Sequence, residues 1–202
     1  MTHATLTNHP TTGHPAPPAT ASLKILVTGG TGVGKTAFIR ATSDITVLST
    51  DEPHTDRGAS TVAGAGTCPP VTTVACDFGR TDLHHDRRTL RLCLFGTPGQ
   101  ERFAFLWDPL AVGAHAAVLL LDTRSPHDCL HTLGRLEQRG LPYVVAVNTF
   151  HGAPGHTSQQ IRDGLRLPDS IPVTACDARD PASATAVLAL LTGPLPPVCD
   201  QR

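Results

Sequence analysis

Residues 29–36 read Gly29-Gly30-Thr31-Gly32-Val33-Gly34-Lys35-Thr36 and match the pattern G-x-x-x-x-G-K-[ST]. An apolar run over residues 23–27 precedes them, and residues 37–40 can continue as a helix. The glycines let such a loop curl so that its backbone N–H groups point at phosphate oxygens, while the N-terminus of the following helix favours an anion. Strand, glycine-rich loop and helix in this order predict a binding site for a nucleoside triphosphate.

Two side chains of this loop have distinct expected roles. Lys35 places a positive charge on the β- and γ-phosphates, and the Thr36 hydroxyl is a ligand for Mg²⁺. The complete set of residues expected to bind phosphate is Gly29, Gly32, Val33, Gly34, Lys35, Thr36 and, further along the chain, Gly99.

The composition limits the class of protein. With 202 residues, 40% hydrophobic residues and a net charge of −1, the chain fits one soluble α/β domain. A sequence pI near 6.8 favours no nucleic-acid partner, and the absence of an apolar run of about 18 residues predicts no direct membrane insertion. The six cysteines include no C-x-x-C pair, which favours a reduced, cytoplasmic compartment.

Apolar runs and helical periods alternate along the chain, and this alternation predicts a three-layer α/β fold of the P-loop NTPase type. We expect a mostly parallel six-stranded sheet with helices on both faces, its second and third strands joined by a polar hairpin at residues 82–88. The domain spans residues 22–193, between a disordered tail (1–21) and a loose tail (194–202). The expected strands cover residues 23–28, 72–78, 90–95, 116–122, 143–148 and 171–175. We expect one helix to begin at Lys35, a second to cover 126–139 and a third to cover 181–191. In the second helix, Leu130, Leu133 and Leu136 should face inward.

Four further stretches give the chain its resemblance to the Ras-like small GTPases. They read Thr73-Val74-Ala75-Cys76-Asp77-Phe78, Phe95-Gly96-Thr97-Pro98-Gly99-Gln100-Glu101, Asn148-Thr149-Phe150-His151 and Cys176-Asp177-Ala178-Arg179. By this resemblance Thr73 contacts the γ-phosphate and Mg²⁺, Gly99 donates its N–H to the γ-phosphate and Gln100 orients the attacking water. It also implies that Asn148, Asp177 and Ala178 bind the base. The Gly/Ala/Thr/Pro-rich residues 51–70 correspond to a long, flexible switch I insertion.

The motifs T-V-A-x-D-F-G-R, F-G-T-P-G-Q and V-N-x-F are most similar to the GTPase-like component of actinobacterial conservons, which are multi-gene signalling units. This resemblance implies a switch that binds GTP and GDP and hydrolyses GTP slowly. It also implies a roadblock-type protein, a small activator-like protein and a membrane sensor kinase-like protein as partners. Recruitment to the inner face of the membrane would then go through those partners.

The chain departs from the GTPase pattern at two positions that matter for ligands. Gly96 stands where the wider family has an aspartate that holds Mg²⁺, so we expect weak Mg²⁺ binding without nucleotide, unless Asp77 or Asp122 substitutes. His151 replaces the aspartate that accepts hydrogen bonds from guanine, and this leaves the choice between GTP and ATP open, with GTP favoured.

Two alternatives belong to other functional classes. A P-loop ATPase or kinase would use the apolar run 118–121 and Asp122 as a Walker B element. A pseudo-GTPase scaffold would bind nucleotide and signal through partners alone, and Gly96 and His151 support this alternative.

Overall fold

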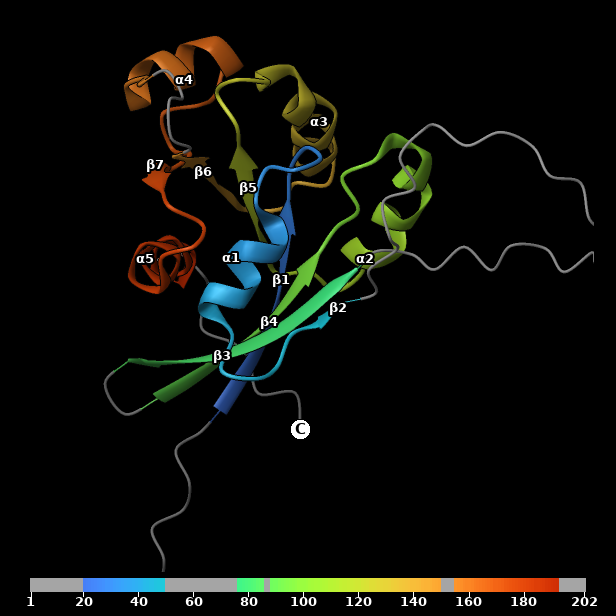
Figure 1. Ribbon diagram of the computed structural model, residues 1–202, viewed down its shortest axis with the longest axis vertical. Coiled ribbons are helices and arrows are strands. Elements are labelled where there is room, and N and C mark those ends of the chain that lie inside the picture. Colours follow the sequence, from blue (N-terminus) through green and yellow to red (C-terminus); the bar gives the residue numbers. More distant parts are fainter. Residues whose placement is uncertain (1–19, 50–75, 86–87, 150–154, 193–202) are drawn as a thin grey trace, which may run out of the picture.

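The computed structural model describes residues 20–49, 76–85, 88–149 and 155–192, which form one seven-stranded sheet with helices packed on it (Figure 1). The strand order is β2-β3-β4-β1-β5-β6-β7. The α/β class and the mostly parallel sheet are confirmed. The predicted number of six strands is wrong, because Leu48–Ser49 adds a two-residue strand, β2, at one edge.

The strands are β1 (Thr20–Thr28), β2 (Leu48–Ser49), β3 (Asp77–His85), β4 (Arg88–Gly96), β5 (Ala116–Leu121), β6 (Tyr143–Asn148) and β7 (Val173–Cys176). The α-helices are α1 (Lys35–Thr42), α2 (Trp107–Ala111), α3 (Leu130–Gln138), α4 (Ser158–Leu165) and α5 (Pro181–Thr192). Two 3₁₀ helices, η1 (Glu101–Leu106) and η2 (Pro126–Cys129), lead directly into α2 and α3.

Five neighbouring strands, β4, β1, β5, β6 and β7, run parallel, while β3 is antiparallel to β4 and β2 to β3. The carboxyl ends of the parallel strands therefore meet at one edge of the sheet. Ligands of open α/β sheets bind in the crevice outside this edge. The topology thus decides where the candidate site lies.

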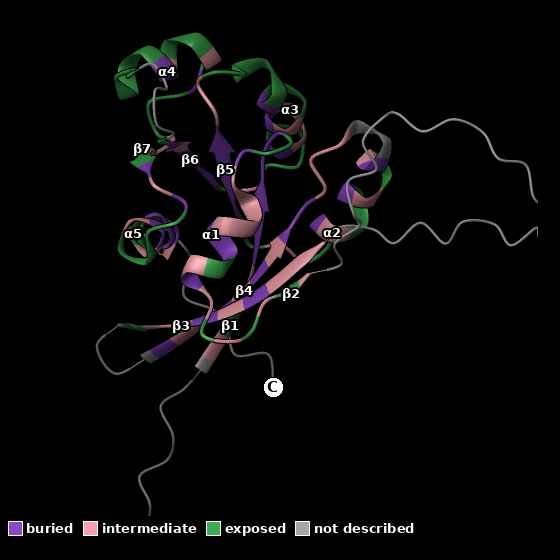
Figure 2. Ribbon diagram, in the orientation of Figure 1, coloured by how far each residue is buried: buried purple, intermediate pink, exposed green. Residues whose placement is uncertain are grey.

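The central strands are covered on both faces. All six residues of β5 are buried, and Figure 2 shows this strand in purple against the largely exposed α4. Alternate β5 residues pack into two clusters: Val118 joins Phe38 of α1 and Leu188 of α5, whereas Leu119 joins residues of α2, α3 and α4. Continuous apolar strands are what such two-sided burial requires.

Some boundaries differ from the sequence predictions. β3 continues to His85, through residues expected in a polar hairpin, because Thr81 is buried and Asp82 forms an ion pair with Arg91 across the strands. Leu130 was predicted to face inward, but 46% of it is exposed at the start of α3.

Three short helices, η1, α2 and α4, were not anticipated, since two or three turns carry little periodicity. Thr157 caps α4 by accepting the N–H of Gln160, whose side chain in turn accepts the N–H of Thr157. Of the helices that the structure describes, none has the length and apolarity that crossing a bilayer requires. Both predicted tails, apart from β1 residues 20 and 21, and the insertion at 51–70 lie outside the described residues.

Candidate nucleotide site

The loop after β1 wraps a pocket of about 680 Å³ at the carboxyl edge of the sheet. The residues lining the pocket are Gly32, Gly34, Lys35, Thr36, Ala37, Arg40, Ala41 and Arg179. Gly29, Gly32 and Gly34 have φ angles of 139°, 74° and 103°, in the region that favours glycine. The backbone thus curls as the sequence pattern predicts, ahead of an α1 that begins at Lys35.

The Lys35 ammonium group lies across this loop. Its Nζ donates to the carbonyl oxygens of Gly29 at 3.0 Å and Gly30 at 2.6 Å. Burial lowers the pKa of Lys35 from 10.5 to about 8, although nearby Asp77 opposes the shift. The loop therefore holds a partly desolvated cation where a triphosphate would supply the opposite charge.

This pKa leads to a prediction about pH. A bound triphosphate favours the charged form, so the affinity for nucleotide should be flat up to pH 8 and then fall about tenfold per pH unit. Titration of labelled nucleotide between pH 7 and 9.5 measures this slope. The Lys35→Arg variant keeps its charge, and its affinity should not change over the same range.

The same shift affects stability without nucleotide, with the opposite sign. Between pH 8 and 10.5 the unfolded chain still holds the Lys35 proton that the folded chain has released, so the free energy of unfolding should rise with pH. Urea unfolding at pH 8 and pH 10 checks the sign against Lys35→Arg, whose side chain stays protonated. A wild-type affinity that stays flat to pH 9.5 would contradict both expectations.

Thr36 meets a carboxylate from the neighbouring part of the sheet. Its hydroxyl donates to Asp77 Oδ2 at 2.5 Å, and Ser49 Oγ donates to Asp77 Oδ1 at 2.6 Å. A hydroxyl that gives its proton to a carboxylate turns its lone pairs outward. Hydroxyl and carboxylate oxygens are ligands that suit Mg²⁺, so the residues present fit this ion.

Gly96 explains how Asp77 reaches this position. The two residues are partners across β3 and β4, and a Cβ atom at residue 96 would lie 3.0 Å from Asp77 Cβ and 3.1 Å from Ile39 Cδ1. The missing aspartate thus leaves room that Asp77 uses. Of the two substitutes considered from the sequence, Asp77 lies beside Thr36.

Restoring the aspartate should therefore harm the protein. We expect Gly96→Asp to lower the free energy of unfolding by about 1–3 kcal/mol through overpacking, and further through repulsion between adjacent carboxylates. Gly96→Ala, which adds only the Cβ, should cost less in urea unfolding. Adding Asp77→Ala to Gly96→Asp should recover part of the loss, and strictly additive costs would contradict this contact.

Asp122, the candidate Walker B residue, has a different partner. Both of its oxygens accept from Arg124, with Nη2 to Oδ2 at 2.7 Å, and this pairing lowers the pKa of Asp122. It lies beside Gly30 and Thr31 in a small pocket of about 30 Å³. No hydrogen bond between Asp122 and Thr36 occurs in the described structure, so this geometry does not favour the Walker B role.

The segment after β4 brings Gly99 and Gln100 to the phosphate loop. A Cβ atom at Gly99 would lie 2.7 Å from Lys35 Nζ and 2.9 Å from the backbone nitrogen of Thr31. Gln100 precedes η1, and its carbonyl accepts the N–H of Phe103. Only glycine fits this approach, as the resemblance implies for a γ-phosphate contact.

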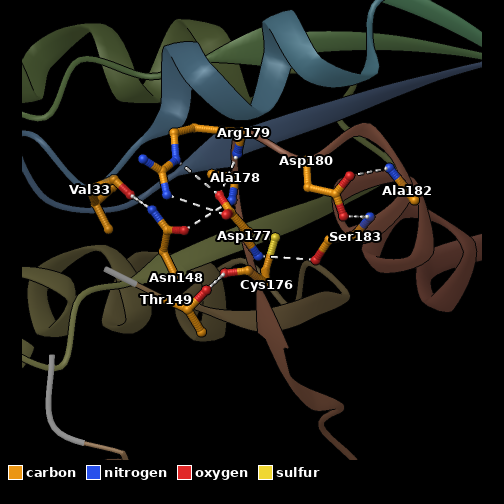
Figure 3. A network of polar contacts seen from close by, with 10 residues as sticks. All are labelled: Val33, Asn148, Thr149, Cys176, Asp177, Ala178, Arg179, Asp180, Ala182 and Ser183. Carbon is orange, nitrogen blue, oxygen red and sulfur yellow. Dashed lines mark hydrogen bonds and ion pairs between the residues drawn. The ribbon is translucent and has the colours of Figure 1, made fainter. Parts of the chain in front are cut away.

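Asn148 joins three segments at the far end of the loop (Figure 3). Its buried side chain donates from Nδ2 to the Val33 carbonyl at 2.9 Å and accepts the Ala178 N–H on Oδ1 at 3.0 Å. The N–H that the resemblance assigns to the base is thus engaged by Asn148 here. The structure thus brings Asn148 and Ala178, both predicted to bind the base, together with Val33 of the phosphate loop.

Asp177 points toward Arg179 in the same network (Figure 3). Asp177 Oδ1 accepts the Arg179 backbone N–H at 2.9 Å and Nε at 3.2 Å, and this pairing raises the pKa of Arg179. The Arg179 side chain lines the pocket, and Asp177 orients the Arg179 guanidinium group. The sequence prediction named Asp177 but missed Arg179, although the Asp-x-Arg spacing was a usable signal.

Two predicted site residues, Thr73 and His151, lie outside the described residues. Ser49 was missed, since nothing in the sequence links it to a residue beyond the insertion at 51–70. In the part of the chain that the structure describes, no three His, Cys, Asp or Glu side chains gather as metal ligands. A cation would therefore rely on Thr36, Asp77 and phosphate oxygens.

A protein-family model described as a conserved hypothetical ATP binding protein matches residues 68–193, more than half of the chain. The match begins after residues 29–36, so the phosphate loop is independent evidence for the same ligand class. It includes the segments that carry Asp77, Gly99, Asn148 and Ala178. The chain therefore belongs to this family and is a nucleotide-binding protein of the P-loop type.

Proposed function

We propose that the protein is a GTP-binding molecular switch that binds and slowly hydrolyses GTP within a bacterial signalling complex. The observation that carries the proposal is the close packing of Gly99 against Lys35 and Thr31. A segment placed there meets the γ-phosphate and is released when hydrolysis removes it. The Asn148 contacts to Val33 and Ala178 support a base end of the GTPase kind.

The side chains around the phosphates have separate roles in this proposal. Thr36 and Asp77 would hold Mg²⁺, which neutralises charge on the phosphate oxygens when bound. Lys35 binds the β- and γ-phosphates. Gln100 orients the attacking water, and Thr73 adds a further contact to the γ-phosphate and Mg²⁺.

The partners follow from the resemblance to conservon GTPases. We propose a roadblock-type protein and a membrane sensor kinase-like protein, with the chain acting in the cytoplasm and reaching the inner face of the membrane through them. A partner cation beside Gln100 would raise a slow intrinsic rate, as arginines supplied in trans do for other switches.

Competition of unlabelled GTP, GDP and ATP against a fluorescent guanine nucleotide, with and without Mg²⁺, tests the proposal. We expect GTP to compete at least about 100-fold better than ATP, which is about 2.7 kcal/mol of discrimination. Equal competition by ATP would overturn the guanine assignment.

The Gln100→Leu variant tests hydrolysis separately from binding. Leucine cannot orient water, so single-turnover GTP hydrolysis should slow by about 10²-fold or more while nucleotide affinity stays unchanged. Identical rates for the wild type and the variant would favour a pseudo-GTPase scaffold.

The alternative function is that of a P-loop ATPase, and the description of the matching family favours it. In that case ATP would replace GTP in the competition. Asp122→Asn would then impair hydrolysis, whereas the GTP-switch proposal expects little effect, because Asp122 is paired with Arg124.

A further inference from the structure

The chain's one tryptophan, Trp107, is held at the start of α2, eight residues after Gly99. It is 4% exposed, and its Nε1 atom has no hydrogen-bond partner among the described residues. A buried indole N–H usually finds a partner. Two guanidinium groups, those of Arg135 and Arg139, lie against this ring.

Arg135 lies in the last turn of α3, and Arg139 is the residue that caps the C-terminal end of this helix, so the two side chains, four residues apart, project from the same side. Their guanidinium carbons lie 5.6 Å and 5.5 Å from the centre of the Trp107 ring, within the range of cation–π attraction. Arg139 Nη2 also reaches Asp108 Oδ1 at 2.8 Å, and Arg135 Nη1 donates to the Ala104 carbonyl at 2.9 Å. The two arginines thus contact η1 at Ala104 and α2 at Trp107 and Asp108.

The segment that the two arginines contact begins beside the phosphate loop. Gly99 and Gln100 lead into η1, which continues into α2 without an intervening residue. Gly99 packs so tightly on Lys35 and Thr31 that a Cβ would not fit, so a small shift of the segment would change its distance from the loop. Arg135 is 23% and Arg139 40% exposed by side chain, and α3 itself packs on the sheet through the buried Leu133 and Leu136.

We propose that Arg135 and Arg139 are positioning residues, which act through Trp107 and Ala104 to hold Gly99 and Gln100 against the phosphate loop. The proposal rests on the proposed function, in which the γ-phosphate, and not the other phosphates, contacts Gly99. It adds a support outside the nucleotide pocket, as neither arginine lines that pocket. Loss of the support should weaken binding of triphosphate and leave that of diphosphate intact.

The test compares Arg135→Met, Arg139→Met and the double variant with the wild type in the full chain. The readouts are the affinities for GDP and for a non-hydrolysable GTP analogue, and the change in Trp107 emission when each binds. Methionine keeps much of the apolar stem and removes the guanidinium. Gln138→Met, an exposed change on the same helix, is the matched control, and Arg135→Lys tests rescue by a side chain that retains charge and a donor.

We expect the ratio of GTP-analogue to GDP affinity to fall by about five- to tenfold in the double variant, the lower range of coupling between sites. GDP affinity should stay within about twofold, and the triphosphate-specific change in Trp107 emission should be lost. Gln138→Met should match the wild type, and Arg135→Lys should recover most of the ratio lost in Arg135→Met.

Two results would overturn the inference. A preserved ratio with a wild-type emission change would show that the arginines do not position Gly99, and an equal loss of GDP affinity would show a general structural role. A wild-type protein that binds both nucleotides equally and shows the same emission change for both would overturn the switch proposal, and this inference with it.

Discussion

Gly29→Ala should abolish useful nucleotide binding, with a loss of about 100-fold or more in affinity. A Cβ atom at this position would lie 2.4 Å from the Leu120 carbonyl oxygen, which belongs to the central strand and cannot move aside. The φ angle of 139° adds strain of about 1–3 kcal/mol for a residue other than glycine. The loop would have to leave its position, and its N–H groups would no longer converge on the phosphates.

Two other glycines serve as controls that separate the effect of the steric clash at Gly29 from the effect of backbone strain. Gly32, inside the loop, and Gly113, far along the chain, have φ angles of 74° and 70° and no atom within 4 Å of an added Cβ. Gly113→Ala should lower stability by about 1 kcal/mol without changing nucleotide affinity, and Gly32→Ala should weaken affinity less than Gly29→Ala. Titration with a fluorescent nucleotide gives the ranking; a Gly29→Ala protein that binds like the wild type would refute the collision.

Asp77→Asn should have the second large effect, on the Mg²⁺ requirement. Asparagine keeps the size of the side chain, and its single carbonyl oxygen can still accept from one of the two hydroxyls, Thr36 or Ser49. It removes the negative charge of Asp77, which Gly96 does not replace. Loss of such a group typically costs about 10- to 100-fold in metal affinity. The Mg²⁺ concentration for half-maximal binding of labelled nucleotide should therefore rise by this factor.

Nucleotide binding in excess EDTA is the internal control, since Asp77→Asn should leave it unchanged or slightly stronger. Asp122→Asn is the matched variant: its carboxylate is already neutralised by Arg124, so its Mg²⁺ dependence should follow the wild type. The reverse outcome, with Asp122 sensitive and Asp77 silent, would assign the metal to the strand-end aspartate and favour the ATPase alternative.

Much of the fold could be predicted because its central strands are unambiguous. The run that forms β5 is apolar throughout, and that of β6 is apolar up to its last residue, Asn148, so the extents of both strands were predicted to within one residue. The shortest elements, in contrast, were not predicted from the sequence. β2 has two residues and depends on pairing with β3, and α2 has five, so neither carries a period that a sequence could show.

The ligand class could be read from the sequence alone, and so could the residues that we expect to meet it. A glycine-rich loop ending in Lys35 and Thr36 is a local structure, specified by neighbouring residues and the φ angles that they allow. Likewise, Asn148 ends β6, and Gly99 and Ala178 come two or three residues after β4 and β7; parallel strands bring their carboxyl ends to one edge.

Which aspartate lies beside Thr36 at this edge of the sheet depends on the tertiary structure. From the sequence, Asp77 and Asp122 were equivalent substitutes for the residue missing at Gly96. The register of β3 on β4 sets Asp77 opposite Gly96 and within hydrogen-bond distance of Thr36, while Asp122 turns to Arg124 two residues on. Such a choice depends on contacts between residues 41 positions apart, as Thr36 and Asp77 are, and these arise from strand pairing rather than from any local pattern.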